Sequence, residues 1–184
     1  MKKLVLLLLC CFMATSALAA SPLRSGLYVG ARLAGMRSEL KVGDKKNHGN
    51  LYGFMGAVGA RSRYLRIEME YLGTRQAKIK RHEMETSWLA GQLYYDIPFK
   101  SKIRPFVNAG WGYHETKIEN KDRPYKETKK GSVWNLGGGL TWNTSTAANI
   151  DLGYRYIDLG DFKTPEGTLK PKNHMIYLGF RYVF

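Results

Sequence analysis

The stretch Leu65-Arg66-Ile67-Glu68-Met69-Glu70-Tyr71 decides the fold. Apolar and charged residues alternate along it, and a period of two places successive side chains on opposite faces of a β-strand. One face of this strand is apolar and ends in an aromatic residue, whereas the other carries one arginine and two glutamates. The location of the remaining charges of the chain indicates which of the two faces meets water.

Alternation with period two recurs through the chain after its N-terminal segment and predicts further strands. Seven strands are expected, at residues 27–34, 64–71, 88–95, 104–113, 134–142, 150–156 and 176–184. An eighth, at about 51–60, is rich in Gly and ambiguous in parity. For this strand we favour Tyr52, Phe54, Gly56 and Val58 on the apolar side. No segment shows a sustained helical period.

The charged residues within the strand cores all lie on one face, opposite a face rich in Trp and Tyr. They are Arg32, Arg66, Glu68, Glu70, Arg104, Asp151, Arg155 and Arg181. Small residues and mixed charges fit the interior of a narrow barrel, where each Arg must find a carboxylate. The apolar face then meets lipid, and closure of the sheet pairs the backbone polar groups. We predict an all-β fold, an eight-stranded antiparallel up-and-down transmembrane β-barrel; the alternative is a soluble sandwich with the aromatic residues in its core.

The aromatic residues and the connections agree with two membrane surfaces. The expected aromatic girdle consists of Tyr71, Trp111, Tyr113, Trp134 and Tyr156 at the outer interface and Tyr95 and Trp142 at the inner one. The linkers expected to be short are 61–63, 98–102 and 143–147, and the polar connections expected to be long are 37–49, 74–85, 115–130 and 160–172. Short periplasmic turns and long outer loops are typical of transmembrane barrels.

The N-terminus has the three parts of a secretory signal peptide: the charged pair Lys2-Lys3, an apolar run at 4–13, and the small residues Ala17-Leu18-Ala19. The run is too short to span a membrane. We expect residues 1–20 to be removed and residues 21–184 to form the barrel domain. Both cysteines leave with the signal, and the net charge falls from +14 to +12. Export argues against nucleic acid as the partner of this basic chain.

Six segments together carry a resemblance to a known family. They are Tyr28-Val29-Gly30-Ala31-Arg32, the stretch from Leu65 to Tyr71, Tyr94-Tyr95-Asp96, Arg104-Pro105-Phe106-Val107, Gly153-Tyr154-Arg155-Tyr156, and Gly179-Phe180-Arg181-Tyr182-Val183-Phe184. The chain resembles the small eight-stranded outer-membrane barrels of the opacity-type, OmpA/OmpX-like superfamily. The resemblance implies a location in the bacterial outer membrane. It leaves the function open, because family members include adhesins, protective surface proteins and proteins of unknown role.

In that family the barrel-assembly machinery reads a last strand with alternating apolar residues and a terminal aromatic. The resemblance assigns this assembly signal to Leu178, Gly179, Phe180, Tyr182 and Phe184. Phe184 is at the same time suited to anchor the chain at the membrane interface.

Two groups of charges are candidate functional sites. The interior residues form an expected lumen ion-pair network, a plug that holds the barrel shut; the alternative is a small pore or channel for anionic or small solutes. The expected loop basic cluster consists of Lys78, Lys80, Arg81, Lys117, Lys121, Arg123, Lys126, Lys129 and Lys130. Its expected partners are outer-membrane lipid and the phosphates of lipopolysaccharide, or acidic glycans of a host surface.

An outer-leaflet lipid-modifying enzyme would need a nucleophile within reach of a base. The histidines His48, His82, His114 and His174 show no His-x-Ser arrangement, although Ser87 and Ser132 lie near outer strand ends. We therefore expect no enzyme activity, no metal, no cofactor and a monomer. The sequence predicts an integral outer-membrane surface protein of a Gram-negative bacterium with a structural or adhesin-like role.

Overall fold

The computed structural model describes residues 26–42, 45–75, 77–79, 82–99, 101–120, 125–145, 147–160, 162–164, 167–169 and 172–184. The expected signal peptide and its cleavage site lie outside the described residues. Within the described part of the chain, no helix is long and apolar enough to cross a membrane. The regular structure found there is β-strand.

Each of the expected strands is present in the described chain. The strands are β1 (Gly26–Val42), β2 (Lys45–Arg61), β3 (Leu65–Arg75), β4 (Ala77–Ile79), β5 (His82–Asp96), β6 (Ile103–Asn120), β7 (Tyr125–Asn143), β8 (Ala148–Asp158), β9 (Phe162–Thr164), β10 (Gly167–Leu169) and β11 (Lys172–Val183). β3 and β4 both pair with β5 and together occupy one position of the barrel. β9 and β10 pair only with each other, as a separate two-stranded hairpin.

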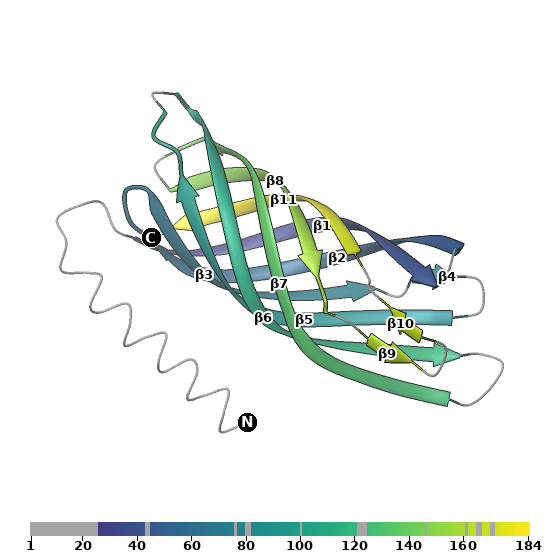
Figure 1. The fold of residues 1–184 in the computed structure, drawn as a ribbon. Helices are drawn as coiled ribbons and strands as arrows, with labels where there is room; N and C mark the ends of the chain where they lie inside the picture. Colours follow the sequence, from purple (N-terminus) through teal and green to yellow (C-terminus); the bar gives the residue numbers. More distant parts are fainter. Residues whose placement is uncertain are drawn as a thin grey trace, which may run out of the picture.

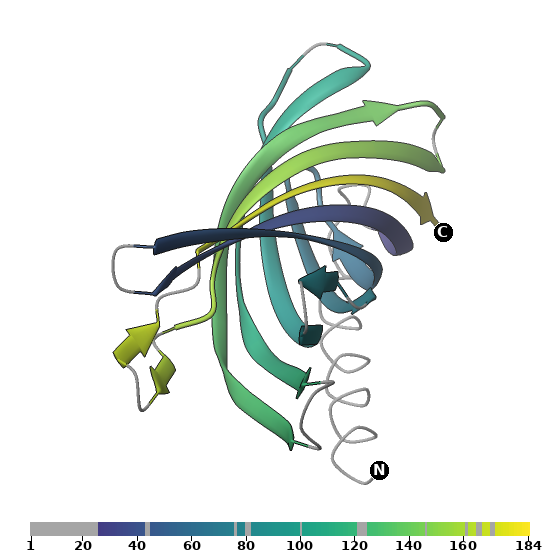
Figure 2. The ribbon, with the colours of Figure 1, turned by 90° about the vertical axis from the view of Figure 1, so that its right-hand side faces the viewer.

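The sheet closes on itself as the predicted eight-stranded antiparallel barrel (Figure 1, Figure 2). The first strand, β1, pairs with β2 on one side and with the last strand, β11, on the other. Leu33 of β1 accordingly lies opposite both Phe54 and Leu178. Closure leaves the wall without a free edge, which is the condition for a sheet to stand in lipid.

The connections at one end of the barrel are short, as expected. Ser62 donates its N–H to the carbonyl of Leu65 at 2.7 Å in the turn between β2 and β3. Ser145 donates to the carbonyl of Ala148 at 3.1 Å between β7 and β8. The C-terminus lies at the same end, where the N–H of Phe184 donates to the carbonyl of Leu27 at 2.9 Å.

The other end differs from expectation, because three of the segments expected as long loops, 37–49, 74–85 and 115–130, are largely strand. β1 runs to Val42 and β2 begins at Lys45, so most of 37–49 is hairpin. β6 runs to Asn120 and β7 begins at Tyr125 within the expected loop 115–130. The ladder continues because antiparallel pairing satisfies backbone N–H and C=O groups outside the membrane as it does within it.

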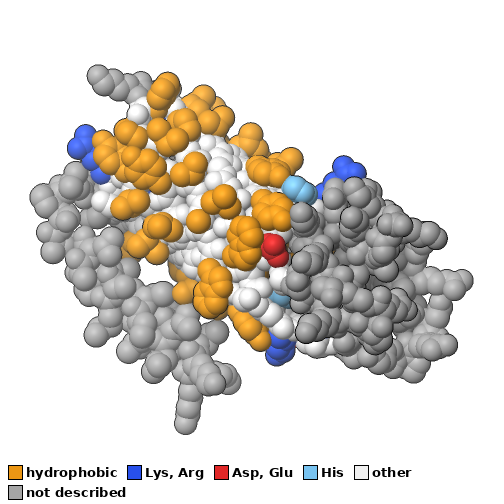
Figure 3. All heavy atoms as spheres, in the orientation of Figure 1, with side chains coloured by type: hydrophobic (Ala, Val, Ile, Leu, Met, Phe, Trp, Pro, Cys, Tyr) orange, Lys and Arg blue, Asp and Glu red, His pale blue; other side chains and the backbone are white. Residues whose placement is uncertain are grey.

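Side chains alternate between the outer wall and the interior. On β1, Leu33 is 66% exposed whereas Arg32 is 1% exposed. On β2, Tyr52 and Phe54 are exposed and Met55 is fully buried, which confirms the favoured parity of this strand. Figure 3 shows hydrophobic side chains spread over the outer wall, with Lys and Arg side chains at its two ends.

Candidate functional site

Four arginines and four carboxylates meet inside the barrel, on strands β1, β3, β5, β8 and β11. They are Arg32, Arg66, Arg155 and Arg181 together with Glu68, Glu70, Asp96 and Asp151. All have the inward parity of their strand and are buried. We refer to these eight residues as the interior network.

Glu70 is the bridge that spans the interior. It accepts a hydrogen bond from Nη1 of Arg32 at 2.7 Å. It also accepts two from Arg155, whose Nη1 and Nη2 lie 2.6 and 3.0 Å from its two carboxylate oxygens. The side chains of all three residues are 0% exposed. In the order of the barrel, β3 and β8 are four positions apart, so this contact joins opposite walls.

Glu68 holds the same arginine from the neighbouring inward position of β3. Nη2 of Arg32 donates to both carboxylate oxygens of Glu68, at 2.7 and 2.6 Å. The hydroxyl of Tyr28 donates to Glu68 Oε1 at 2.7 Å. Nη1 of Arg66 lies 3.7 Å from that same oxygen and links Glu68 to the remaining pairs.

The other two carboxylates lie toward the end of the barrel with the short turns. Asp151 accepts from Nε and Nη2 of Arg181 at 2.5 and 2.9 Å, a two-point contact, and from the hydroxyl of Thr141 at 2.7 Å. Asp96 accepts from Nε and Nη2 of Arg66 at 3.0 and 2.7 Å. Charge-assisted bonds of this kind are stronger than neutral ones, and the fork of Arg fixes their direction.

Three tyrosines, Tyr28, Tyr94 and Tyr177, fill the space between the charges. The guanidinium carbon of Arg66 lies 4.3 Å from the ring centroid of Tyr94, and that of Arg155 lies 4.7 Å from the ring of Tyr177. Both are within the range of cation–π attraction. The Tyr94 hydroxyl accepts a hydrogen bond from Arg155. Tyr177 covers Gly153, where a Cβ would come within 2.3 Å of the ring, so only Gly fits beneath it.

A layer of buried apolar side chains lies on the loop side of the network, and it corrects the expectation of an interior made of Gly and charge. Its members are Met36, Leu51, Met55, Leu72, Trp88, Val133, Ile157, Leu159 and Met175. Leu72 follows Glu70 along β3 and Ile157 follows Arg155 along β8, each at the next inward position. Close-packed apolar side chains leave little room for water, so the network is covered from the loop side.

Seven of the eight interior residues expected from the sequence lie in the network, and Arg104 does not. Arg104 is half-buried, and its Nε has no hydrogen-bond partner among the described residues. The sequence reasoning missed Asp96, because the expected strand ended one residue before it. Its inward parity, two residues after Tyr94, was the available signal. With Asp96 the network contains equal numbers of positive and negative groups.

The expected aromatic girdle lies on the outer wall. Tyr71, Tyr95, Trp111, Tyr113, Trp134 and Trp142 are each exposed, and the half-buried Tyr156 packs its ring 5.8 Å from that of Trp134. Of the expected assembly signal, Leu178, Phe180, Tyr182 and Phe184 are exposed on the same wall. Gly179 faces inward, where a Cβ would come within 2.5 Å of Arg32 Cγ.

Most of the loop basic cluster falls outside what the structure describes. The side chains of Lys78, Lys80, Arg81, Lys117, Lys121, Arg123 and Lys126 lie outside the described part of the chain. Lys129 is half-buried, and exposed Lys130 forms an ion pair with Glu115 at 3.1 Å.

Among the residues considered for lipid hydrolysis, His114 lies on the opposite face of the wall from Ser87 and Ser132. His114 is completely buried in the interior, with Nδ1 3.3 Å from the hydroxyl of Thr116. Ser132 pairs with Tyr113 and Ser87 with Glu115, at outward positions of β7 and β5. This arrangement does not place either serine beside His114.

Comparisons with known proteins agree with this architecture. Residues 4–184 match the family model of the outer membrane protein beta-barrel domain. The chain is similar to Neisserial surface protein A, with 17% identity, 86% of this chain and 97% of that chain covered, and a TM-score of 0.71. None of the curated protein sequences matches the chain.

Two further solved structures share the fold at low sequence identity. OprG from Pseudomonas aeruginosa is 12% identical, with 87% of this chain and 95% of that chain covered at a TM-score of 0.54. Ail, the attachment invasion locus protein of Yersinia pestis, is 15% identical, with 84% and 98% covered at a TM-score of 0.51. A second structure of Ail contains the heparin analogue sucrose octasulfate.

Proposed function

The chain belongs to the family of bacterial outer-membrane β-barrel proteins, and we propose that it is a non-conducting surface protein that acts through its outer wall and loops. The observation that carries this proposal is the filled interior. Four buried arginines are matched by four carboxylates, and the buried apolar layer covers them. A small eight-stranded barrel is filled by its own side chains, and the eight residues of the interior network together carry no net charge that would attract an ion.

Conductance across a planar lipid bilayer tests the closed interior. We expect no discrete openings from the folded wild-type protein. A variant with both Glu70→Ala and Arg155→Ala removes the side chains that bridge the interior and serves as the comparison for an enlarged path. Discrete, stable openings of the wild type would refute the proposal and support the small pore instead.

We further propose an adhesin-like role, in which the basic loops bind acidic glycans. The support is the loop basic cluster, and in particular its six members in segment 115–130, which are Lys117, Lys121, Arg123, Lys126, Lys129 and Lys130. Ail, which shares the fold, has been solved with a heparin analogue. Contacts between exposed charges weaken as salt screens them. We therefore expect cells that display the protein to bind heparin in a salt-sensitive way.

Replacing the six basic residues of segment 115–130 with Ala should abolish heparin binding. Lys102→Ala, at an exposed position of a short turn on the opposite end, is the control and should leave binding unchanged. Absent binding, or binding that does not respond to salt, contradicts the adhesin-like role. Such a result would not contradict the proposal of a closed interior, because conductance tests that property separately.

Lipid hydrolysis is the less favoured alternative, since His114 and the two serines face opposite sides of the wall.

We also propose that the protein is exported with removal of residues 1–20 and stands in the membrane as a monomer. The mass of the mature chain isolated from the outer membrane tests the cleavage.

A further inference from the structure

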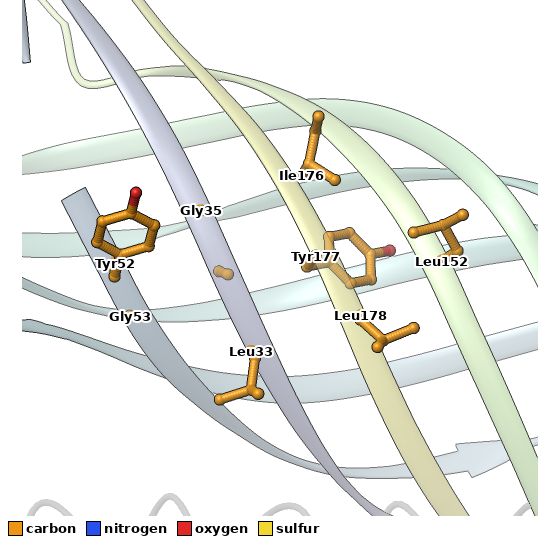
Figure 4. A pocket seen from close by; sticks show the side chains of 9 residues that line it. Leu33, Gly35, Tyr52, Gly53, Leu152, Ile176, Tyr177 and Leu178 are labelled. Carbon is orange, nitrogen blue, oxygen red and sulfur yellow. The ribbon is translucent and has the colours of Figure 1, made fainter. Parts of the chain in front are cut away.

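An apolar groove lies on the outer wall across strands β2, β1, β11 and β8. Its floor is Gly35, which has no side chain, and its sides include Tyr52 and Ile176. These two residues are the cross-strand neighbours of Gly35 on its two sides. Leu33 and Leu178 continue the groove toward the middle of the wall. Figure 4 shows Tyr52 and Ile176 on either side of the bare Gly35 backbone.

Polar groups lie directly above this groove on the same outward face. Arg37 and His174 are two residues nearer the loop end than Gly35 and Ile176, and they are direct partners across β1 and β11. Arg37 is exposed, and its other partner, Asn50 of β2, is exposed as well. Side chains that oppose each other in an antiparallel pair are close enough for one ligand to contact both.

His174 is held in place by the aromatic residues around it. Its Nδ1 lies 2.5 Å from the hydroxyl of Tyr154, and its ring packs edge-on against Tyr156 with centroids 5.6 Å apart. Tyr156 in turn packs against Trp134. When the Tyr154 hydroxyl donates to Nδ1, the ring proton is on Nε2, which becomes a donor for an anionic oxygen.

These contacts also fix the depth of the polar pair. Tyr156 and Trp134 stand on the loop side of the wall, and aromatic residues gather where lipid headgroups begin. The cationic Arg37 and the N–H donor His174, at headgroup level above an apolar groove, complement an amphiphile with an anionic head and an acyl chain. Two copies of the chain joined by a two-fold axis through this face would bring their Arg37 residues together, so charge disfavours a dimer here.

We propose that this face binds lipid A, the phosphorylated glycolipid anchor of lipopolysaccharide in the outer leaflet. One phosphate contacts Arg37 and His174, and one acyl chain lies in the groove over Gly35. The inference goes beyond the proposed function, because it uses the wall of the barrel and neither its interior nor its loops.

Gly35→Leu fills the groove without disturbing the fold. The nearest atom to a Cβ at this position is a ring carbon of Tyr52 at 4.0 Å, which is an ordinary contact. Gly56→Leu is the matched control, since Gly56 lies at an outward position of β2 and a Cβ there meets no atom within 4 Å. The double variant Arg37→Ala, His174→Ala removes the phosphate contacts, and Arg63→Ala, at an exposed turn on the other end, controls for loss of charge.

The experiment measures lipid A retained per barrel by native mass spectrometry, after extraction from phosphatidylcholine nanodiscs doped with bisphosphorylated lipid A. We expect Gly35→Leu and the double variant each to lower retention about tenfold or more, because hydrogen bonds to charged groups and buried acyl contacts are both lost. Gly56→Leu and Arg63→Ala should match the wild type. Lipid A stripped of its phosphates should bind the wild type weakly and be insensitive to the double substitution.

If Gly35→Leu retained as much lipid A as the wild type, no acyl chain would occupy the groove. If the double variant retained as much lipid A as the wild type, no phosphate would bind Arg37 and His174. Either result overturns the proposal. Heparin binding and conductance of these variants should remain those of the wild type. Failure here is therefore distinguishable from failure of the proposed function.

Discussion

Removing the carboxylate of Glu70 is the sharpest test of the interior network. Glu70→Ala leaves two guanidinium groups without their shared acceptor, in a part of the barrel that side chains fill. The two arginines are not affected equally. Arg32 keeps Glu68, which accepts two hydrogen bonds from it at 2.7 and 2.6 Å. Arg155 keeps no carboxylate among the described residues: it retains only a hydrogen bond to the Tyr94 hydroxyl and its contact with the Tyr177 ring.

The expected loss of stability is therefore that of one uncompensated buried charge. Breaking a buried ion pair by removing one partner costs about 3–5 kcal/mol, mostly because the remaining charge stays desolvated. The same reasoning predicts a change of sign in the double variant. Arg155→Met should destabilise the wild type, but it should stabilise the Glu70→Ala protein, because there it removes the charge that lost its partner.

Reversible urea unfolding in phospholipid vesicles, followed by tryptophan fluorescence, measures these free energies. Lys130→Ala is the control, since Lys130 forms an ion pair with Glu115 but its side chain is 56% exposed. Exposed pairs contribute about 0–1 kcal/mol. If Glu70→Ala loses no more stability than Lys130→Ala, or if Arg155→Met destabilises both backgrounds equally, the interior is solvated and the reasoning is wrong.

Three further outcomes concern the outer wall, the packing of the interior and the last strand. Leu136→Arg places a charge on the lipid face, between the two aromatic belts, and should lower the free energy of unfolding by about 2 kcal/mol in the same assay; no loss would mean that this face does not meet lipid. Gly153→Ala drives a methyl group into the ring of Tyr177 and should cost about 1–3 kcal/mol, whereas Gly56→Ala, with open space around it, should be neutral. Deleting Phe184 should reduce the amount of heat-modifiable protein found in the outer membrane of cells, while leaving refolding in detergent intact. Normal assembly of the protein without Phe184 would show that this residue is not part of an assembly signal.

The fold could be predicted from the sequence because a period of two converts directly into two faces of a sheet. In 65–71 the charges and the apolar residues separate completely, and the same separation in the other strands identifies the charged face as the interior. The expected strand positions and the favoured parity of β2 therefore agree with the structure. The length of the strands at the loop end could not be predicted in this way. Polar hairpins such as β6–β7 continue beyond the membrane, where no alternation of apolar and polar residues indicates a strand.

The interior was harder to predict than the wall. Parity identifies which residues point inward, but a one-residue error at a strand end removed Asp96 from the expected network. The apolar layer was missed because inward apolar residues, such as Met55 and Leu72, resemble breaks in an alternating pattern. The groove over Gly35 depends on four strands whose register is fixed only by closure, so no local pattern reveals that Arg37 and His174 lie side by side.

Closure also explains why the interior of this barrel contains charged side chains, although apolar side chains could fill the same space. Contacts along the wall are made between neighbours in the sheet and exist in an open sheet as well as in a closed one. The bond from Arg155 to Glu70 spans four positions of the barrel and forms only when β11 has returned to β1. A buried carboxylate that finds its arginine only in the closed form penalises open or shifted arrangements, because they leave a charge unpaired in the interior. We infer that the network specifies closure, which leaves recognition to the outer wall and the loops.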